Sequence, residues 1–184
     1  TGADNTLTFT LSTNCELALN STITISGLNG SQTSSTSALS LSSSPGSIFA
    51  STAEWEIAGT LTFKVTFENS STFNASYVFT TTLRNHDTVQ TSPPILVSAT
   101  VEAGTYDATI KAVQMTIPDE DAFGVVNGAN PHLIVIPLVS SATAKQSNHY
   151  ANAENTITLA FQMNCHLSVG SEVTFTGLTG TQTE

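Results

Sequence analysis

The chain contains few charged residues and hardly any basic ones. Only 10% of its 184 residues are charged, four are Lys or Arg, and the formal net charge at pH 7 is -10. A nucleic-acid-binding surface needs clustered Lys and Arg to replace the counterions on phosphates, and the sequence holds no such cluster. Anionic membrane surfaces are disfavoured for the same reason. We therefore expect no nucleic-acid partner.

Long apolar runs are also missing. No run approaches the ~20 residues that a membrane-spanning helix needs, so we expect no membrane insertion. The sequence has no initiating Met, no signal peptide and no anchor motif. We interpret it as an interior piece of a longer secreted chain.

Motifs for catalysis or zinc binding are absent. There is no CxxC or HExxH pattern and no Gly-x-Ser-x-Gly elbow, and the four His are scattered without paired spacing. We expect no enzymatic activity and no cofactor. Weak candidates for Ca²⁺ ligands are three consecutive acidic residues and two nearby amides, although a solvated acidic turn is the better interpretation: Asp119, Glu120, Asp121, Asn127 and Asn130.

What the chain does contain is Ser and Thr, which supply 54 of the 184 residues, and a long internal repeat. Residues 5–33 return without a gap as residues 155–183, and 14 of the 32 aligned positions from Ala3/Ala153 to Ser34/Glu184 are identical. A fixed period of this kind indicates an array of structural units. The sequence predicts one β-module over residues 1–150 and the start of the next repeat over residues 151–184, or strands that complete a neighbouring module.

The only two cysteines, Cys15 and Cys165, occupy the same position of the two copies. A unit therefore holds no partner for its own cysteine. A bridge between neighbouring units or chains is one interpretation. We favour reduced thiols buried at equivalent places, because free Cys is among the most buried residue types.

Alternation of apolar and polar residues predicts strands throughout the chain. The expected strands cover residues 6–11, 22–25, 61–67, 77–83, 95–101 and 108–117, with a deeply buried strand at 133–139. Residues 61–67 and 77–83 are interpreted as a hairpin, and residues 31–47 as a loop with at most one edge strand. No window shows a helical period. The fold class is therefore all-β, an antiparallel β-sandwich of immunoglobulin-like or jelly-roll type.

Several of these segments resemble a known kind of module. The run from Gly124 to Pro131, the motifs Lys145-Gln146-Ser147 and Asn155-Thr-Ile-Thr158, and the ending Gly27-Leu-x-Gly-x-Gln-Thr33 are similar to tandem β-modules of very large secreted proteins from algae and other protists. The resemblance implies an extracellular coat, appendage or fibre. It implies no activity.

Four glycosylation sequons fall at predicted turns, where an acceptor is exposed. A secreted eukaryotic chain would carry covalent N-glycans at some of them: Asn20, Asn29, Asn69 and Asn74.

Two predicted strands, residues 156–162 and 172–176, open the second copy, and two strands alone are marginal in water. Their apolar faces need a cover, so we expect inter-module contacts at Ile157, Leu159, Phe161, Val173 and Phe175.

These observations favour a structural repeat module of an extracellular or cell-surface fibre, appendage or coat, assembling head-to-tail with copies of itself. The alternative is a cell-surface adhesin or glycan-binding module, with Trp55, Tyr77 and Phe79 as an aromatic platform for sugar. An ice-binding face built from the outward Thr-x-Thr pairs is a further alternative.

Overall fold

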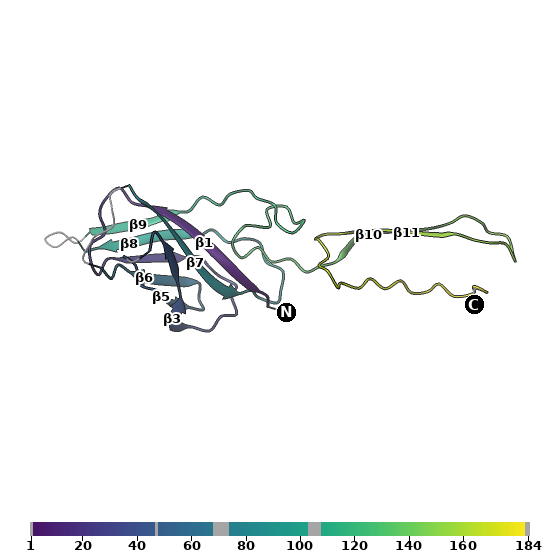
Figure 1. Cartoon of the computed structure of the whole chain (residues 1–184), viewed down its shortest axis with the longest axis horizontal. Coiled ribbons are helices and arrows are strands. Elements are labelled where there is room, and N and C mark those ends of the chain that lie inside the picture. Colours follow the sequence, from purple (N-terminus) through teal and green to yellow (C-terminus); the bar gives the residue numbers. More distant parts are fainter. Residues whose placement is uncertain (1, 47, 68–73, 103–107, 183–184) are drawn as a thin grey trace. The chain divides into compact units, whose positions relative to one another are not determined.

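A computed structural model describes residues 2–46, 48–67, 74–102 and 108–182. In these ranges every regular element is a β-strand, and the structure shows no helix that could cross a membrane. The strands pair antiparallel, and the three-stranded and six-stranded sheets share one core (Figure 1). The predicted antiparallel β-sandwich is therefore confirmed.

The chain forms two compact units. Unit 1 comprises Thr1–Glu120 and Ala129–Ile136, and unit 2 comprises Asp121–Gly128 and Pro137–Glu184. The repeat predicts a boundary at residue 150, whereas strand β10 (Val139–Gln146) groups with the second copy because it pairs with strand β11 (Ile157–Met163).

Unit 1 contains a six-stranded sheet and a three-stranded sheet. The larger sheet has the order β3-β5-β6-β2-β8-β9. Its strands are β3 (Thr36–Ser40), β5 (Thr52–Glu56), β6 (Thr60–Lys64), β2 (Thr22–Ser26), β8 (Leu96–Val101) and β9 (Ala108–Gln114). The smaller sheet has the order β1-β7-β4, formed by β1 (Asp4–Ser12), β7 (Ser76–Arg84) and β4 (Ser42–Ser44).

Both sheets of unit 1 contribute their apolar faces to one core. Along β1, β2, β6 and β7 buried and exposed residues alternate, as a strand with one face in the core requires. Aromatic rings meet in its centre, with 4.6 Å between the ring centroids of Phe63 and Phe79 and 4.7 Å between those of Phe49 and Phe79. The outward positions are largely Thr and Ser, as in the cross-strand hydroxyl pairs Thr6–Thr82 and Thr24–Thr62.

The predicted hairpin of residues 61–67 and 77–83 is wrong. Both segments contain strands, but β6 pairs with β2 and β5, while β7 pairs with β1 and β4. Alternation identifies which face of each strand enters the core, and it says nothing about the partner strand. The chain between them therefore crosses from one sheet to the other.

Residues 31–47 hold more structure than the predicted loop with one edge strand. β3 joins the edge of the six-stranded sheet beside β5, and β4 joins the three-stranded sheet beside β7. Leu41 lies between them and is buried, and its N–H donates to the carbonyl of Ser51. One buried leucine thus anchors the change of sheet.

The predicted buried strand at residues 133–139 is also wrong. In this run only Ile134 is buried, and it forms an isolated bridge with Gln90 in which each residue donates to the other, at 2.9 and 3.0 Å. Val135 and Ile136 are exposed. An apolar run becomes a buried strand only where other strands flank it, and in the described residues Ile134 meets Gln90 in an isolated bridge outside the sheets of unit 1.

A backbone hydrogen bond holds the residues before β1 against those after β7. Asn85 follows β7, and its N–H donates to the carbonyl of Ala3 at 2.9 Å. The Gln90 side chain donates to the carbonyls of Asn29 and His132. The start of β1, the residues after β7 and the Ile134 bridge therefore belong to one end of unit 1.

Unit 2 is a hairpin followed by an extended segment. β10 and β11 pair from Gln146–Ile157 to Val139–Met163, with an irregularity between Val139 and Ser141. The predicted strand at residues 156–162 is confirmed by β11, whereas residues 172–176 pair with no strand in the described part of the chain. Its equivalent in the first copy, β2, lies between β6 and β8, and unit 2 offers no such neighbours.

Candidate assembly interface

The apolar positions of the second copy are uncovered. Leu17 and Ile25 are completely buried in unit 1, while their equivalents Leu167 and Phe175 are both 44% exposed. The other equivalents behave in the same way: Ile157, Val173 and Leu178 are exposed, and Leu7, Ile23 and Leu28 are buried. Equivalent positions of the repeat thus lie in the core of the first copy and on an exposed apolar face in the second.

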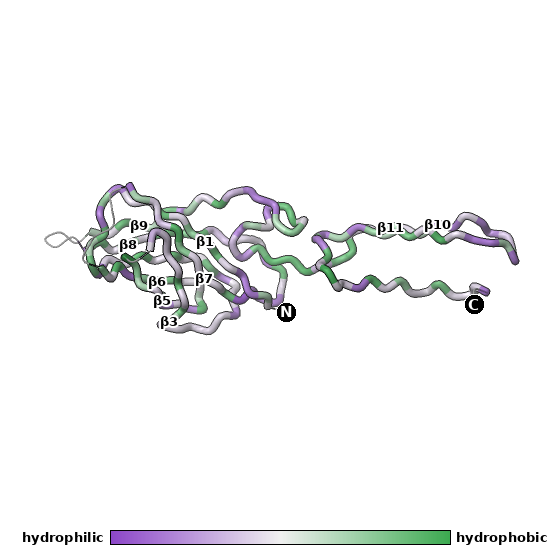
Figure 2. The backbone as a smooth tube through the Cα atoms, in the orientation of Figure 1, coloured by the Kyte–Doolittle hydropathy of each residue, from purple (hydrophilic) through white to green (hydrophobic). Residues whose placement is uncertain are grey.

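The residues predicted to make inter-module contacts all lie on this face. One internal contact joins the two segments, between the rings of Phe161 and Phe175, whose centroids are 5.7 Å apart. Leu159 is half-buried, and the other four are exposed. Green, hydrophobic stretches can be followed along the hairpin and the C-terminal segment in Figure 2. In the described residues of unit 2, no second layer of structure covers this apolar face.

The three-stranded sheet of unit 1 ends at β1. Among the described residues β7 is the only strand that pairs with β1, so its other side is an open edge. An open edge presents unpaired N–H and C=O groups and is a template for a further strand.

The connection between β10 and β11 explains the motifs Lys145-Gln146-Ser147 and Asn155-Thr-Ile-Thr158 in part. The Asn155 side chain accepts hydrogen bonds from the backbone N–H groups of Ser147 and Asn148, both at 3.1 Å, and donates to the side chain of Gln146. Residues 145–147 and 155 therefore close the β10–β11 connection. Asn5, the equivalent of Asn155 in the first copy, donates its side-chain N–H to the side chain of Asn85 instead.

Three of the four sequon asparagines lie within the described residues, and all three are exposed: Asn20, Asn29 and Asn74. Asn20 and Asn74 have positive φ angles, which Asn tolerates better than most residues in turns. The hydroxyl residue differs between sites, since Ser76 is exposed while Ser31 is buried and donates to the carbonyl of Arg84. Asn69 lies outside the described residues.

The acidic run does not form a metal centre in the described part of the chain, where no group of three or more His, Cys, Asp or Glu could hold an ion. Asp121 accepts a hydrogen bond from the N–H of Asn127, so its carboxylate orders a turn. In the same described ranges, the weak Ca²⁺ candidates Asp119 and Glu120 do not converge with Asp121 on one position that could hold an ion.

The aromatic platform for sugar is wrong. Trp55, Tyr77 and Phe79 are buried core residues, and the Trp55 indole donates to the carbonyl of Thr33 at 2.9 Å. A shallow depression of about 450 Å³ lies beside Trp55, but the indole itself is 1% exposed. No sugar could stack on these rings without opening the core.

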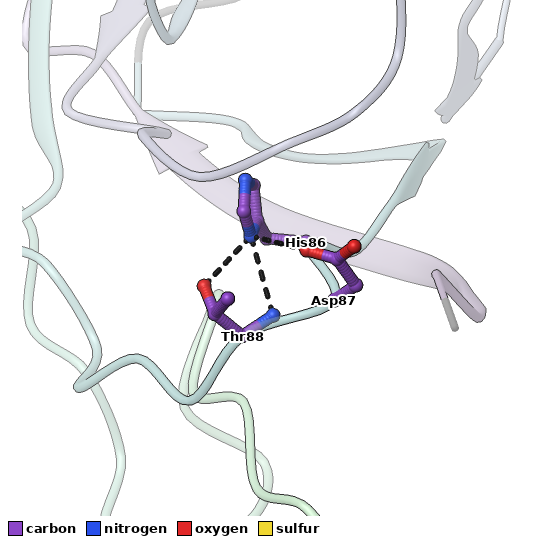
Figure 3. Close-up of polar contacts among 3 residues, drawn as sticks. All are labelled: His86, Asp87 and Thr88. Carbon is purple, nitrogen blue, oxygen red and sulfur yellow. Dashed lines mark hydrogen bonds and ion pairs between the residues drawn. The ribbon is translucent and has the colours of Figure 1, made fainter.

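The histidines are separate from one another and have different surroundings. At the surface, His86 Nδ1 lies 3.0 Å from a carboxylate oxygen of Asp87 and 2.7 Å from the hydroxyl of Thr88 (Figure 3). The N–H of Thr88 donates to the same ring nitrogen at 3.2 Å. The three residues are consecutive in the sequence and lie at the surface. The contact therefore orders a local turn.

Sequence reasoning missed His132. It is fully buried at a positive φ of 54°, and neither ring nitrogen has a hydrogen-bond partner in the described structure. Desolvation lowers the pKa of His132, and the backbone of Gly30 opposes this shift only in part. A His beside a Pro in a polar loop carries no sequence signal for burial.

Both cysteines are free thiols and half-buried. Cys15 packs against the core of unit 1. Full burial was therefore predicted wrongly. Cys15 and Cys165 form no disulfide with each other, and their reduced state in an assembly stays a prediction.

Comparison of the chain with protein-family models, with curated proteins and with solved structures found no match in any of the three.

Proposed function

We propose that the chain is a structural repeat module of an extracellular fibre, appendage or coat, which assembles head-to-tail with copies of itself. The observation that carries the proposal is the contrast between the copies: positions that are core in unit 1 form an exposed apolar face in unit 2. Because these apolar positions are covered by other strands in unit 1, the exposed face of unit 2 favours a partner that supplies similar strands.

The size of this face supports association. Burying a Val, Leu, Ile or Phe side chain contributes roughly 1.5–3 kcal/mol, and at least five such side chains are exposed on the second copy. They are Ile157, Phe161, Leu167, Val173 and Phe175. Because the apolar face lies on unit 2 and the proposed partner surface lies on unit 1 of another copy, the contact is heterologous. Contacts of that type extend into filaments when they do not close into rings.

The surface of unit 1 suits an extracellular setting. Its outward strand positions carry hydroxyl groups in place of charges, and exposed sequons stand at turns. N-glycans would add a solubilising coat without protein charge. These features support secretion and give no role to a cofactor or an active site.

The test is concentration-dependent association of the full chain, followed by sedimentation velocity and electron microscopy. We expect oligomers at high concentration that become shorter or vanish in a Phe161→Glu/Phe175→Glu double variant, because two charges would have to be buried at the contact. The matched control is Phe67→Glu, an exposed phenylalanine of unit 1, which should associate like the wild type. A wild-type chain that stays monomeric at every concentration contradicts the proposal.

A further inference from the structure

We infer that the open edge of β1 is an acceptor site for one strand, the segment Pro137–Ser147 that contains β10, supplied by a second copy of this chain in which β10 exchanges β11 for β1. The assignment rests on the head-to-tail assembly proposed above and specifies its contact. It follows from the repeat, because β11 is the equivalent of β1 and the structure shows which strand β11 takes.

The first step concerns the direction of the backbone groups along β1. Hydrogen bonds at both ends of the strand connect odd-numbered residues to the β7 side, through the carbonyls of Ala3 and Thr13, which accept from Asn85 and Asn74. Antiparallel strands alternate between residues that bond to one neighbour and residues that point to the other side. The backbone groups of Thr6, Thr8 and Thr10 therefore face the open edge.

The second step concerns β11. Its ladder with β10 begins at Thr156, whose carbonyl accepts from the N–H of Ser147, and continues at Asn164, whose N–H donates to the carbonyl of Leu138. Even-numbered residues of the second copy therefore bond to β10. Subtracting 150 places these bonds on the even-numbered residues of β1. The side of the strand that β10 occupies in the second copy is the side that is open in the first.

The third step concerns the side chains. Transferring the register places Ala144 opposite Phe9 and Ala142 opposite Leu11, and Lys145 opposite Thr8. Phe9 is a core residue, and Thr8 is exposed. Small alanines would therefore lie on the inward face at the margin of the sandwich, and the charge would lie outside, as is typical of an edge strand. The smaller sheet would grow from three strands to four.

The repeat also selects the occupant. Among the described residues no strand pairs with the outer side of β1, whereas its equivalent β11 has β10 on that side. The edges at β3, β4 and β9 are open as well in the described residues, but no repeat equivalent shows a strand on them. The edge of β1 is the one for which the chain itself contains the complementary strand.

The experiment measures binding of a fluorescent synthetic peptide, residues 137–147, to the full chain by anisotropy. We expect saturable binding that falls about tenfold or more when Thr8→Pro removes one donor from the open edge. Thr8→Val, which keeps the backbone donor and the branched shape, should bind within about twofold of the wild type. Peptide binding that is absent, or unchanged by Thr8→Pro, overturns the inference.

Modified peptides test the register without altering the protein. N-methylation at Thr143, whose N–H faces β11 in the hairpin, should weaken binding about tenfold, since it deletes a ladder bond. N-methylation at Ala144 points to the opposite side and should change binding by less than about twofold. Equal effects of the two peptides overturn the assigned edge, even if Thr8→Pro does not fold.

The outcomes also separate this inference from the function proposed above. If the chain associates in sedimentation but the peptide does not bind, the assembly proposal stands and the β1 site fails. If the peptide binds with the expected pattern while the chain stays monomeric, β1 accepts a strand of this sequence, but its supply by a second copy fails together with the proposed assembly.

Discussion

His132 is a single residue whose charge state is coupled to folding. Burial lowers its pKa below the ordinary value of 6.5, so the native state binds this proton less readily than the unfolded chain does. Stability from the neutral ring is fully present above pH 6.5 and is lost as the pH falls from there towards the lower native value. The slope approaches about 1.4 kcal/mol per pH unit for one proton.

We predict that the free energy of unfolding, measured with urea between pH 7.5 and 5, falls with pH in the wild type and falls less in His132→Asn. Asn accepts the positive φ and does not titrate, although the smaller side chain lowers stability at every pH. The control is His86→Asn, at the exposed surface turn, which should retain the wild-type fall. A wild-type profile that is flat over this range would show that His132 is charged without cost in the folded chain.

Glycosylation is a second property set by individual residues. We predict that the chain, expressed through a eukaryotic secretory pathway, carries a glycan at Asn74, detected by mass spectrometry of its glycopeptide. Ser76→Ala should remove this glycan and Ser76→Thr should keep it, because the acceptor motif needs a hydroxyl at this position. An unmodified Asn74 in the wild type would count against the secreted setting.

At the scale of strands and segments, the repeat supplies a matched pair for measuring burial. Leu17→Ala should lower the free energy of unfolding by about 2–5 kcal/mol, because this side chain is completely buried in unit 1. Leu167→Ala, the same change at the equivalent exposed position, should cost less than about 1 kcal/mol in the monomer. Chemical denaturation of dilute protein gives both values. Similar losses would mean that the second copy is packed in solution.

The strands themselves could largely be predicted, since β1, β2, β6 and β7 follow a period of two residues. Their partners could not. β1 pairs with β7 although the paired residues lie 64 to 80 positions apart in the sequence. The predicted hairpin of β6 and β7 was wrong because these two strands belong to different sheets. Residues 172–176 have the same alternation as β2 yet form no strand, because strand formation also needs flanking strands.

The candidate interface was predictable in its residues and unpredictable in its geometry. Alternation placed Ile157 and Phe161 on one face, and the repeat matched residues 155–183 to the first two strands of residues 1–150. That β1 lies at a sheet edge, with Thr8 directed outward, follows from the sheet order and its hydrogen bonds. Trp55 shows the converse limit, because an aromatic residue on a strand has the same pattern whether it lines a core or a binding site.

For the whole molecule, covalent and non-covalent assembly can be separated. Cys15 and Cys165 are free thiols, so we predict that association of the full chain is the same with and without reductant. Non-reducing gels should show monomer, and the Cys15→Ser/Cys165→Ser variant should sediment like the wild type. Covalent multimers that collapse on reduction would identify a disulfide between copies.

The contacts at Ala3 and Ile134 determine how unit 1 would respond to pulling. Tension applied between Thr1 and Ile136 would pass from Ala3 to Asn85, along five residues to Gln90, and across the two hydrogen bonds to Ile134. This path bypasses the core and is far shorter than the chain it spans. If the proposed assembly is loaded in this way, those few bonds would break first, and β1 would then peel from β7 one pair at a time, beginning at Asp4–Arg84. Because Leu7 and Phe9 of β1 are core residues, this peeling would open the core soon after the first bonds break.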